Sequence, residues 1–166
     1  MAHSATEWVS LLRPGDLVVV AQGVAEPTPL LEAALSADIS DLEIFVEPLL
    51  GSVDVIPAHF DDLPRVLGRR GRSIVILMQV APDRDGRGHS LGLAVDHTYR
   101  MLDQARLVVA EINERYPVTT APRIPAAAIH ASVRTSRSIP QVPPARLGPE
   151  HGEIARHVAS LVSDGT

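Results

Sequence analysis

The stretch between residues 81 and 92 concentrates the residue types that could carry out chemistry. It reads Ala-Pro-Asp-Arg-Asp-Gly-Arg-Gly-His-Ser-Leu-Gly and follows the most apolar run of the sequence. Asp83 and His89 supply acid–base groups, and the glycines let the backbone approach a ligand closely. Open α/β sheets bind ligands at the carboxyl ends of their strands. The alternative is a tight turn whose aspartates cap the backbone, and composition alone favours that alternative.

Glu26, Asp96 and two histidines are further candidates. Glu26 precedes Pro27 at a predicted helix start, where a carboxylate favours the positive end of the helix dipole. It could instead act as a nucleophile or base, but the helix-start role is favoured. Asp96 is predicted to cap the next helix and is also a candidate acid or base. His89 and His97 lack a clear third ligand, so no metal site is predicted.

These residues need a scaffold of alternating strands and helices. Apolar runs predict buried strands, and residues at 3.6-residue spacing predict helices between them. Such alternation indicates an α/β fold with an open, mainly parallel sheet and flanking helices. The expected strands are 16–21, 42–46, 73–80, 107–112 and a short one near Ile129; the expected helices are 28–37, 97–105 and 149–163.

Composition excludes several chemistries. The chain has 166 residues and no cysteine, and all 15 of its basic residues are arginines. It therefore has no lysine for a Schiff base and no thiolate nucleophile. A net charge of −5 and only five aromatic residues argue against nucleic-acid binding. The sequence contains no run long enough to span a membrane and no signal peptide, so a soluble cytoplasmic protein is expected.

The sequence resembles the acetyl-CoA hydrolase/transferase family, in its 4-hydroxybutyrate CoA-transferase branch. The 81–92 loop and Val95-Asp96-His97-Thr98 are similar to the family pattern PPD-x-x-G-x-x-SLG…VD-x-T. Residues 105–113 are similar to A-x-x-VIAEVN, and 56–64 to IP-x-HFSD-x-P. The opening βα unit and the last helix also match, so the resemblance runs in order through nearly the whole chain.

The resemblance implies a single domain, residues 1–166, like the N-terminal domain of a CoA-transferase. The family's second domain, which carries the glutamate nucleophile, has no counterpart here, and the segment near residues 46–54 is shorter than in the family. No bound cofactor is implied, and a coenzyme A thioester is the implied substrate. The substrate contacts that the resemblance implies are Gln22, Gly23, Gln79, Gly86, Ser90 and Gly92.

Three functions are compatible with this pattern. The chain could handle acyl-CoA thioesters as half of a CoA-transferase or hydrolase, with a partner chain supplying the glutamate. It could be a free-standing, repurposed enzyme that acts on an acyl thioester, such as one tethered to a carrier protein. In that enzyme Glu26, Asp83, His89 or Asp96 would act as acid or base. It could also be a non-catalytic binding or scaffold domain. Without the second domain, the surface that this domain would cover is exposed, which predicts a homo-oligomer or a second subunit on that face.

Overall fold

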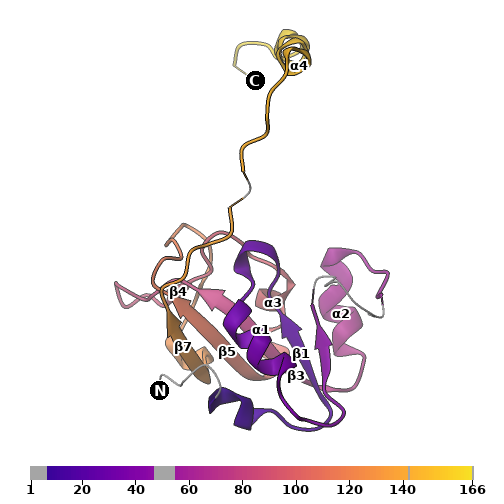
Figure 1. Cartoon of the computed structure of the whole chain (residues 1–166), viewed down its shortest axis with the longest axis vertical. Helices are drawn as coiled ribbons and strands as arrows, with labels where there is room; N and C mark the ends of the chain where they lie inside the picture. The colour runs from indigo at the N-terminus through magenta and orange to yellow at the C-terminus, as the bar shows by residue number, and fades with distance from the viewer. Residues whose placement is uncertain (1–6, 47–54, 142, 166) are drawn as a thin grey trace.

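The computed structural model describes residues 7–46, 55–141 and 143–165. Its centre is a five-stranded sheet in the order β2-β1-β3-β5-β7, in which every neighbouring pair is parallel (Figure 1). The predicted α/β fold with an open parallel sheet is thereby confirmed. The strands are β1 (Asp16–Val20), β2 (Glu43–Phe45), β3 (Ser73–Val80), β5 (Ala105–Asn113) and β7 (Ala131–Thr135).

Both faces of the sheet are covered, which explains why its central strands are apolar nearly throughout. Leu17 and Val19 of β1 belong to a core cluster on the face covered by α2 (Leu63–Gly68) and α3 (His97–Arg100). The alternate residues Val18 and Val20 belong to the cluster on the other face. There α1 (Thr28–Leu35) and the 3-10 turn η1 (Glu7–Leu11) contribute the buried side chains of Leu30, Leu31 and Trp8.

The helix predicted over residues 97–105 is shorter than expected. It consists of α3, which ends at Arg100, and a separate 3-10 turn η4 (Leu102–Gln104). The chain has to become extended at Ala105, because β5 starts there and pairs with β3. The predicted N-cap is confirmed, since the Asp96 side chain accepts a hydrogen bond from the Thr98 backbone N–H.

A second, two-stranded sheet extends the carboxyl edge. Strand β4 (His89–Ser90) pairs antiparallel with β6 (Arg123–Ile124). The strand expected near Ile129 starts slightly later, as β7, after the 3-10 turn η5 (Ala126–Ala128). Two further 3-10 turns are η2 (Gly23–Ala25) and η3 (Phe60–Asp62). The predicted shortening near residues 46–54 lies almost wholly outside the described residues.

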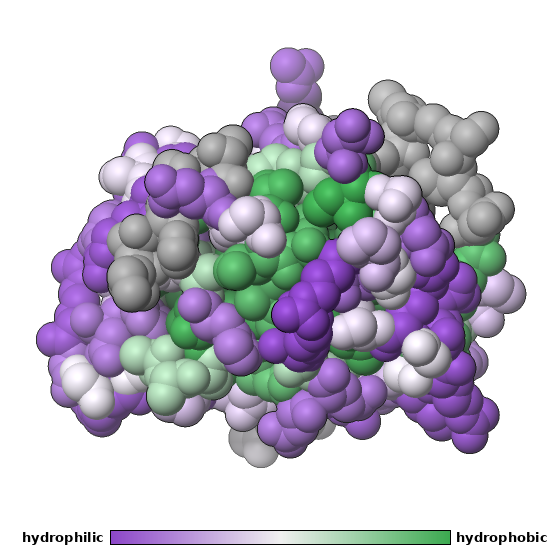
Figure 2. All heavy atoms as spheres, turned by 90° about the horizontal axis from the view of Figure 1, so that it is seen from below, coloured by the Kyte–Doolittle hydropathy of each residue, from purple (hydrophilic) through white to green (hydrophobic). Residues whose placement is uncertain are grey.

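Ion pairs stabilise the amino edge of the sheet. Asp16, at the start of β1, is buried and pairs with Arg106 of β5 at 2.6 Å. Arg72 pairs with Asp41 at 2.8 Å. Seen from this edge, charged and polar side chains surround an apolar centre (Figure 2). The candidate residues lie at the opposite, carboxyl edge, where open α/β sheets bind their ligands.

The last helix stands away from the sheet. Residues 136–148 contain no helix or strand in the part that the structure describes, and α4 (Pro149–Ser160) follows them at a distance from the body (Figure 1). Every residue of α4 is exposed. Within the described ranges, each helix is too short or too polar to cross a bilayer.

Candidate functional site

The loop between β1 and α1 is held at both ends by polar contacts. The Gln22 backbone N–H donates to a carboxylate oxygen of Asp96 at 2.8 Å. The buried amide of Gln79 donates to the Val24 carbonyl at 3.1 Å and to the Glu26 carbonyl at 3.4 Å. The structure thus brings four predicted site residues together, Gln22 with Asp96 and Gln79 with Glu26. These contacts fix the loop above the carboxyl ends of β1 and β3.

A buried ion pair supports the same loop from β5. Glu111 is fully buried, and its two carboxylate oxygens accept from Arg137 at 2.7 and 2.9 Å. Thr135 donates to the same carboxylate at 2.6 Å. The Arg137 guanidinium also donates to the Glu26 carbonyl. The pair therefore links the ends of β5 and β7 to the loop that carries Glu26.

Asn113 completes this polar layer. Its side-chain amide donates to the Gln79 amide oxygen at 2.8 Å and to the Arg137 carbonyl at 3.1 Å. Buried polar groups are expensive unless they are hydrogen-bonded, and these groups satisfy one another. The layer is consequently a rigid base for the loop 22–26.

The upper side of this loop is open. Gly23 has a φ of +60°, and a Cβ placed on it would meet no atom within 4 Å. The Glu26 side chain is half-buried and accepts a hydrogen bond from the Thr28 hydroxyl at 2.9 Å. Helix α1 begins at Thr28, so Glu26 lies just before the helix start, as predicted. A ligand can approach Gly23 and the Glu26 carboxylate from solvent.

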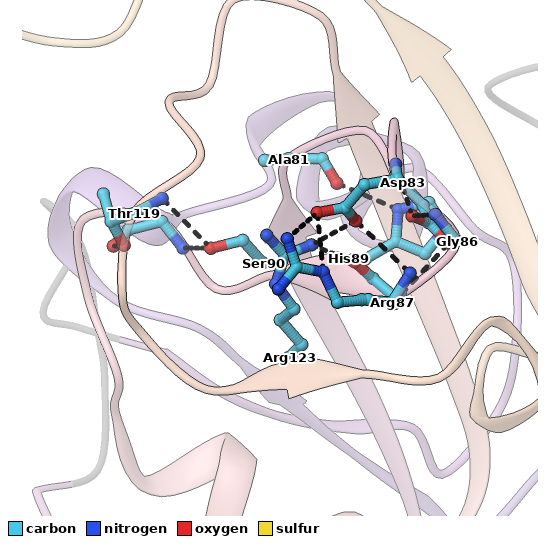
Figure 3. A network of polar contacts seen from close by, with 11 residues as sticks. Ala81, Asp83, Gly86, Arg87, His89, Ser90, Thr119 and Arg123 are labelled. Atoms are coloured by element: carbon cyan, nitrogen blue, oxygen red, sulfur yellow. Dashed lines mark hydrogen bonds and ion pairs between the residues drawn. The ribbon is translucent and has the colours of Figure 1, made fainter.

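The loop 81–92 is organised mainly by its own aspartates (Figure 3). Asp83 accepts from the backbone N–H groups of Asp85, Gly86 and Gly88 at 3.3, 2.9 and 3.1 Å. This is the capped-turn arrangement that composition favours. Asp83 therefore shapes the loop in this structure.

Asp85 binds two arginines. Its carboxylate pairs with Arg87 at 2.9 Å and with Arg123 of β6 at 3.0 Å. Burial acts to raise the pKa of Asp85, but the hydrogen bonds and charges of these arginines outweigh it and hold the pKa below its ordinary value. Asp85 is thus ionised at neutral pH and ties the loop to β6.

His89 and Ser90 point into the structure rather than into solvent. The ring Nδ1 of His89 lies 2.9 Å from the Ala81 carbonyl, and because a carbonyl only accepts, Nδ1 carries the proton. The Ser90 hydroxyl is fully buried and accepts from the Gly92 N–H at 3.1 Å and from the Thr119 N–H at 3.4 Å. Both side chains hold the base of the loop, whereas Gly86 is exposed at its tip.

Burial raises the pKa of Tyr116 above its ordinary value of 10.0, and the hydroxyl accepts from the Leu93 N–H at 3.3 Å. The folded state therefore keeps this proton at a pH where the unfolded chain loses it. The stability that the protonated Tyr116 hydroxyl contributes is therefore fully present below about pH 10 and decreases as the pH rises further. In a pH titration of the folded chain, we expect the phenolate absorbance of Tyr116 to appear above pH 10. The Tyr116→Phe variant identifies this signal, because it lacks it. A transition at or below pH 10 would contradict this.

Replacing Asp96 by alanine should weaken both elements that it connects. The substitution removes the cap of α3 and the acceptor of the Gln22 N–H, at an expected cost of about 1–2 kcal/mol in unfolding free energy. Asp96→Asn keeps a side-chain oxygen and should lose less than half as much. Urea unfolding measures the free-energy loss of both variants. An Asp96→Ala variant as stable as the parent would show that Asp96 does not stabilise these two elements.

His97 lies at the start of α3, on the same side of the sheet as α2. Its buried ring makes edge contacts with Phe45 and Phe60, with centroids 5.6 and 5.3 Å apart. Among residues 7–46, 55–141 and 143–165, no three histidine or acidic side chains are placed to hold a metal ion. His97 thus packs as an aromatic core residue.

A hollow of about 470 Å³ lies beside the end of β5. It is close to the buried polar layer in sequence, because its lining residues follow Asn113 or Arg137 within four positions. It offers a guanidinium, a hydroxyl and an amide to a ligand at the carboxyl edge. The lining residues are Arg115, Ser138, Ile139 and Gln141.

Sequence reasoning assigned no role to Glu111, Asn113 or Arg137. A signal for the first two exists, because Glu111 and Asn113 are the polar residues of the otherwise apolar stretch 107–113 of β5. A carboxylate in a strand that is covered on both faces must find a partner. Arg137 has no such signal, since it lies in a polar, proline-rich stretch.

The chain is similar to known CoA-transferases. It is 31% identical over 122 residues to the 4-hydroxybutyrate coenzyme A transferase of Clostridium kluyveri, a match that covers 69% of this chain and 27% of the relative. The chain is CoA-transferase-like. No family model matches it.

Solved structures agree in fold. RipA from Yersinia pestis superposes with a TM-score of 0.83 at 23% identity, covering 99% of this chain and 49% of that one. The 4-hydroxybutyrate CoA-transferase from Porphyromonas gingivalis superposes with a TM-score of 0.74 at 23% identity, and the match covers 99% of this chain and 46% of that one. This CoA-transferase-like chain has an α/β fold like that of the N-terminal domain of a CoA-transferase. It spans about half the length of the solved structures and about a quarter of the curated relative.

Proposed function

We propose that this chain forms one half of a CoA-transferase-like enzyme that acts on an acyl-CoA thioester. The other half supplies the glutamate nucleophile, either further along the same polypeptide or from a partner chain. The observation that carries the proposal is the match of 99% of this chain to about half of each solved relative. The similarity to a 4-hydroxybutyrate CoA-transferase supports a CoA thioester as substrate.

The loop 22–26 is the part of this half that we assign to the acyl group. Its backbone is fixed by Asp96, Gln79 and Arg137, while Gly23 leaves open space above it. A rigid loop beside open space suits a substrate that must be held in one orientation. Gly86, at the exposed tip of the second loop, is a further backbone contact for the thioester.

Among the four acid–base candidates we assign direct contact with substrate to Glu26. Its half-buried carboxylate has a hydroxyl as partner, whereas Asp83 accepts from three backbone N–H groups and Asp96 from two. His89 donates to a carbonyl inside the loop. These three residues act by holding the two loops in place.

The test uses a hybrid in which the 166 residues are followed by the carboxy-terminal part of the Clostridium kluyveri enzyme. The hybrid should transfer CoA from acetyl-CoA to 4-hydroxybutyrate, and the 166-residue chain alone should not. Glu26→Gln should slow the hybrid by roughly 10²-fold, while the exposed Glu32→Gln on α1 should not change its rate. Because the transfer converts one CoA thioester into another and releases acetate, turnover is followed by chromatographic separation of acetyl-CoA from 4-hydroxybutyryl-CoA. Equal turnover by the chain alone would refute the proposal.

A further inference from the structure

Helix α4 carries a row of exposed apolar side chains. Ile154 and Val158 are 60% and 56% exposed, and Leu161 and Val162, just after the helix, are 85% and 58% exposed. Their spacing of four, seven and eight residues places them on one side of the helix. We refer to these four residues as the α4 face. A soluble protein rarely leaves such a face uncovered.

The helix also needs support from outside the chain's own body. It has 12 residues, and isolated helices shorter than about 12–15 residues are marginal in water. Gly152 in its interior weakens it further. A helix of this kind becomes stable by burying its apolar face, which α4 does not do against any described part of the chain.

The connection to the body keeps α4 at a distance. Residues 136–148 include three prolines, and the described residues 136–141 and 143–148 run away from the end of β7 without helix or strand (Figure 1). A proline-rich segment of this length reaches roughly 40 Å at about 3.1 Å per residue. The space between α4 and the carboxyl edge is therefore wide enough for another folded unit.

The length of the solved relatives favours one candidate for that unit. The solved relatives match 99% of this chain, so α4 lies within the matched part, and the remaining half of each relative has no counterpart in these 166 residues. We infer that the α4 face binds the complementary half of a CoA-transferase, whether that half follows in the same polypeptide or comes from another. This inference rests on the proposed function and names its docking surface.

A second apolar area faces the same side of the molecule. Leu93 and Val118 are 51% and 46% exposed on two loops at the carboxyl edge of the sheet. The loops adjoin each other, because the Thr119 hydroxyl donates to the Gly92 carbonyl at 2.6 Å. The same half that covers α4 can cover these side chains.

The first test uses the 166-residue chain. We expect a monomer by light scattering in which the α4 amides exchange as fast as those of an unstructured peptide, while the β3 amides are protected. A monomer with protected α4 amides would show that the helix needs no partner. A dimer that Val158→Asp dissociates would assign the α4 face to a second copy. Either result overturns the inference.

The second test measures the same amides in the hybrid. We expect α4 to exchange at least tenfold more slowly than in the 166-residue chain, and Val158→Asp to abolish this protection. Leu35→Asp is the matched control, because Leu35 is also 56% exposed but lies at the far end of α1. Unchanged α4 exchange in a hybrid whose β3 amides are protected would overturn the inference.

The two tests separate the docking surface from the activity. A hybrid that protects α4 but transfers no CoA keeps the docking surface and refutes the proposed function. A hybrid that transfers CoA while α4 exchanges freely keeps the function and refutes the docking surface.

Discussion

The Glu111→Gln variant is expected to lose about 3 kcal/mol of unfolding free energy. The substitution leaves the Arg137 guanidinium without its charged partner while it remains next to the Glu26 carbonyl. Removing one member of a buried ion pair usually costs roughly 3–5 kcal/mol. The lower end applies because the Arg137 side chain is 24% exposed and can partly reach water. Urea denaturation with linear extrapolation measures the loss.

Glu114→Gln is the matched control. Glu114 is next to the same strand and pairs with Arg84 and Arg134, but its side chain is 42% exposed. Exposed ion pairs contribute only about 0–1 kcal/mol. Equal losses in the two variants would show that the Glu111 pair is no more important than a surface pair.

The Gly92→Ala variant is expected to lose about 3 kcal/mol through a combination of backbone strain and steric clash. Gly92 has a φ of +64°, a conformation that costs an alanine roughly 1–2 kcal/mol. A Cβ there would lie 2.3 Å from the ring of Tyr116, which is buried, and 3.0 Å from the Pro117 carbonyl oxygen. Moving the ring would also disturb the hydrogen bond from the Leu93 N–H.

Gly86→Ala separates the two contributions. Gly86 lies in the same loop with a φ of +72°, but its Cβ would meet nothing within 4 Å. This variant should lose only the strain, so the difference between the two measures the clash with Tyr116. Thermal or urea unfolding of both variants gives that difference, and equal losses would mean that the ring moves away at no cost.

The interior of the sheet could be predicted because each central strand is covered on both faces. The apolar run at 73–80 defines β3 without any knowledge of its neighbours. The helix over 97–105 could not be predicted correctly, because its end depends on where β5 must start to pair with Ile74. Pairing between distant segments overrides local helical spacing there.

The candidate site divides in the same way. Asp83 and Asp96 bind backbone groups within a few residues, which follows from their local turn and cap chemistry. By contrast, Gln79 donates to the Val24 carbonyl, 55 positions away, and Arg137 donates to the Glu26 carbonyl, 111 positions away. No local pattern encodes such contacts.

The sequence by itself determined the fold class and the two loops at the carboxyl edge, because apolar periodicity and turn chemistry depend on neighbouring residues. The CoA-transferase resemblance came from family-like motifs that occur in the same order along the chain. Only the tertiary structure decided that Glu111 and Arg137 support the loop of Glu26, and that the apolar side of α4 is exposed rather than part of the core. The physical reason is that burial depends on what the folded chain places opposite a residue. The same helical spacing fits a core helix and a docking helix equally well.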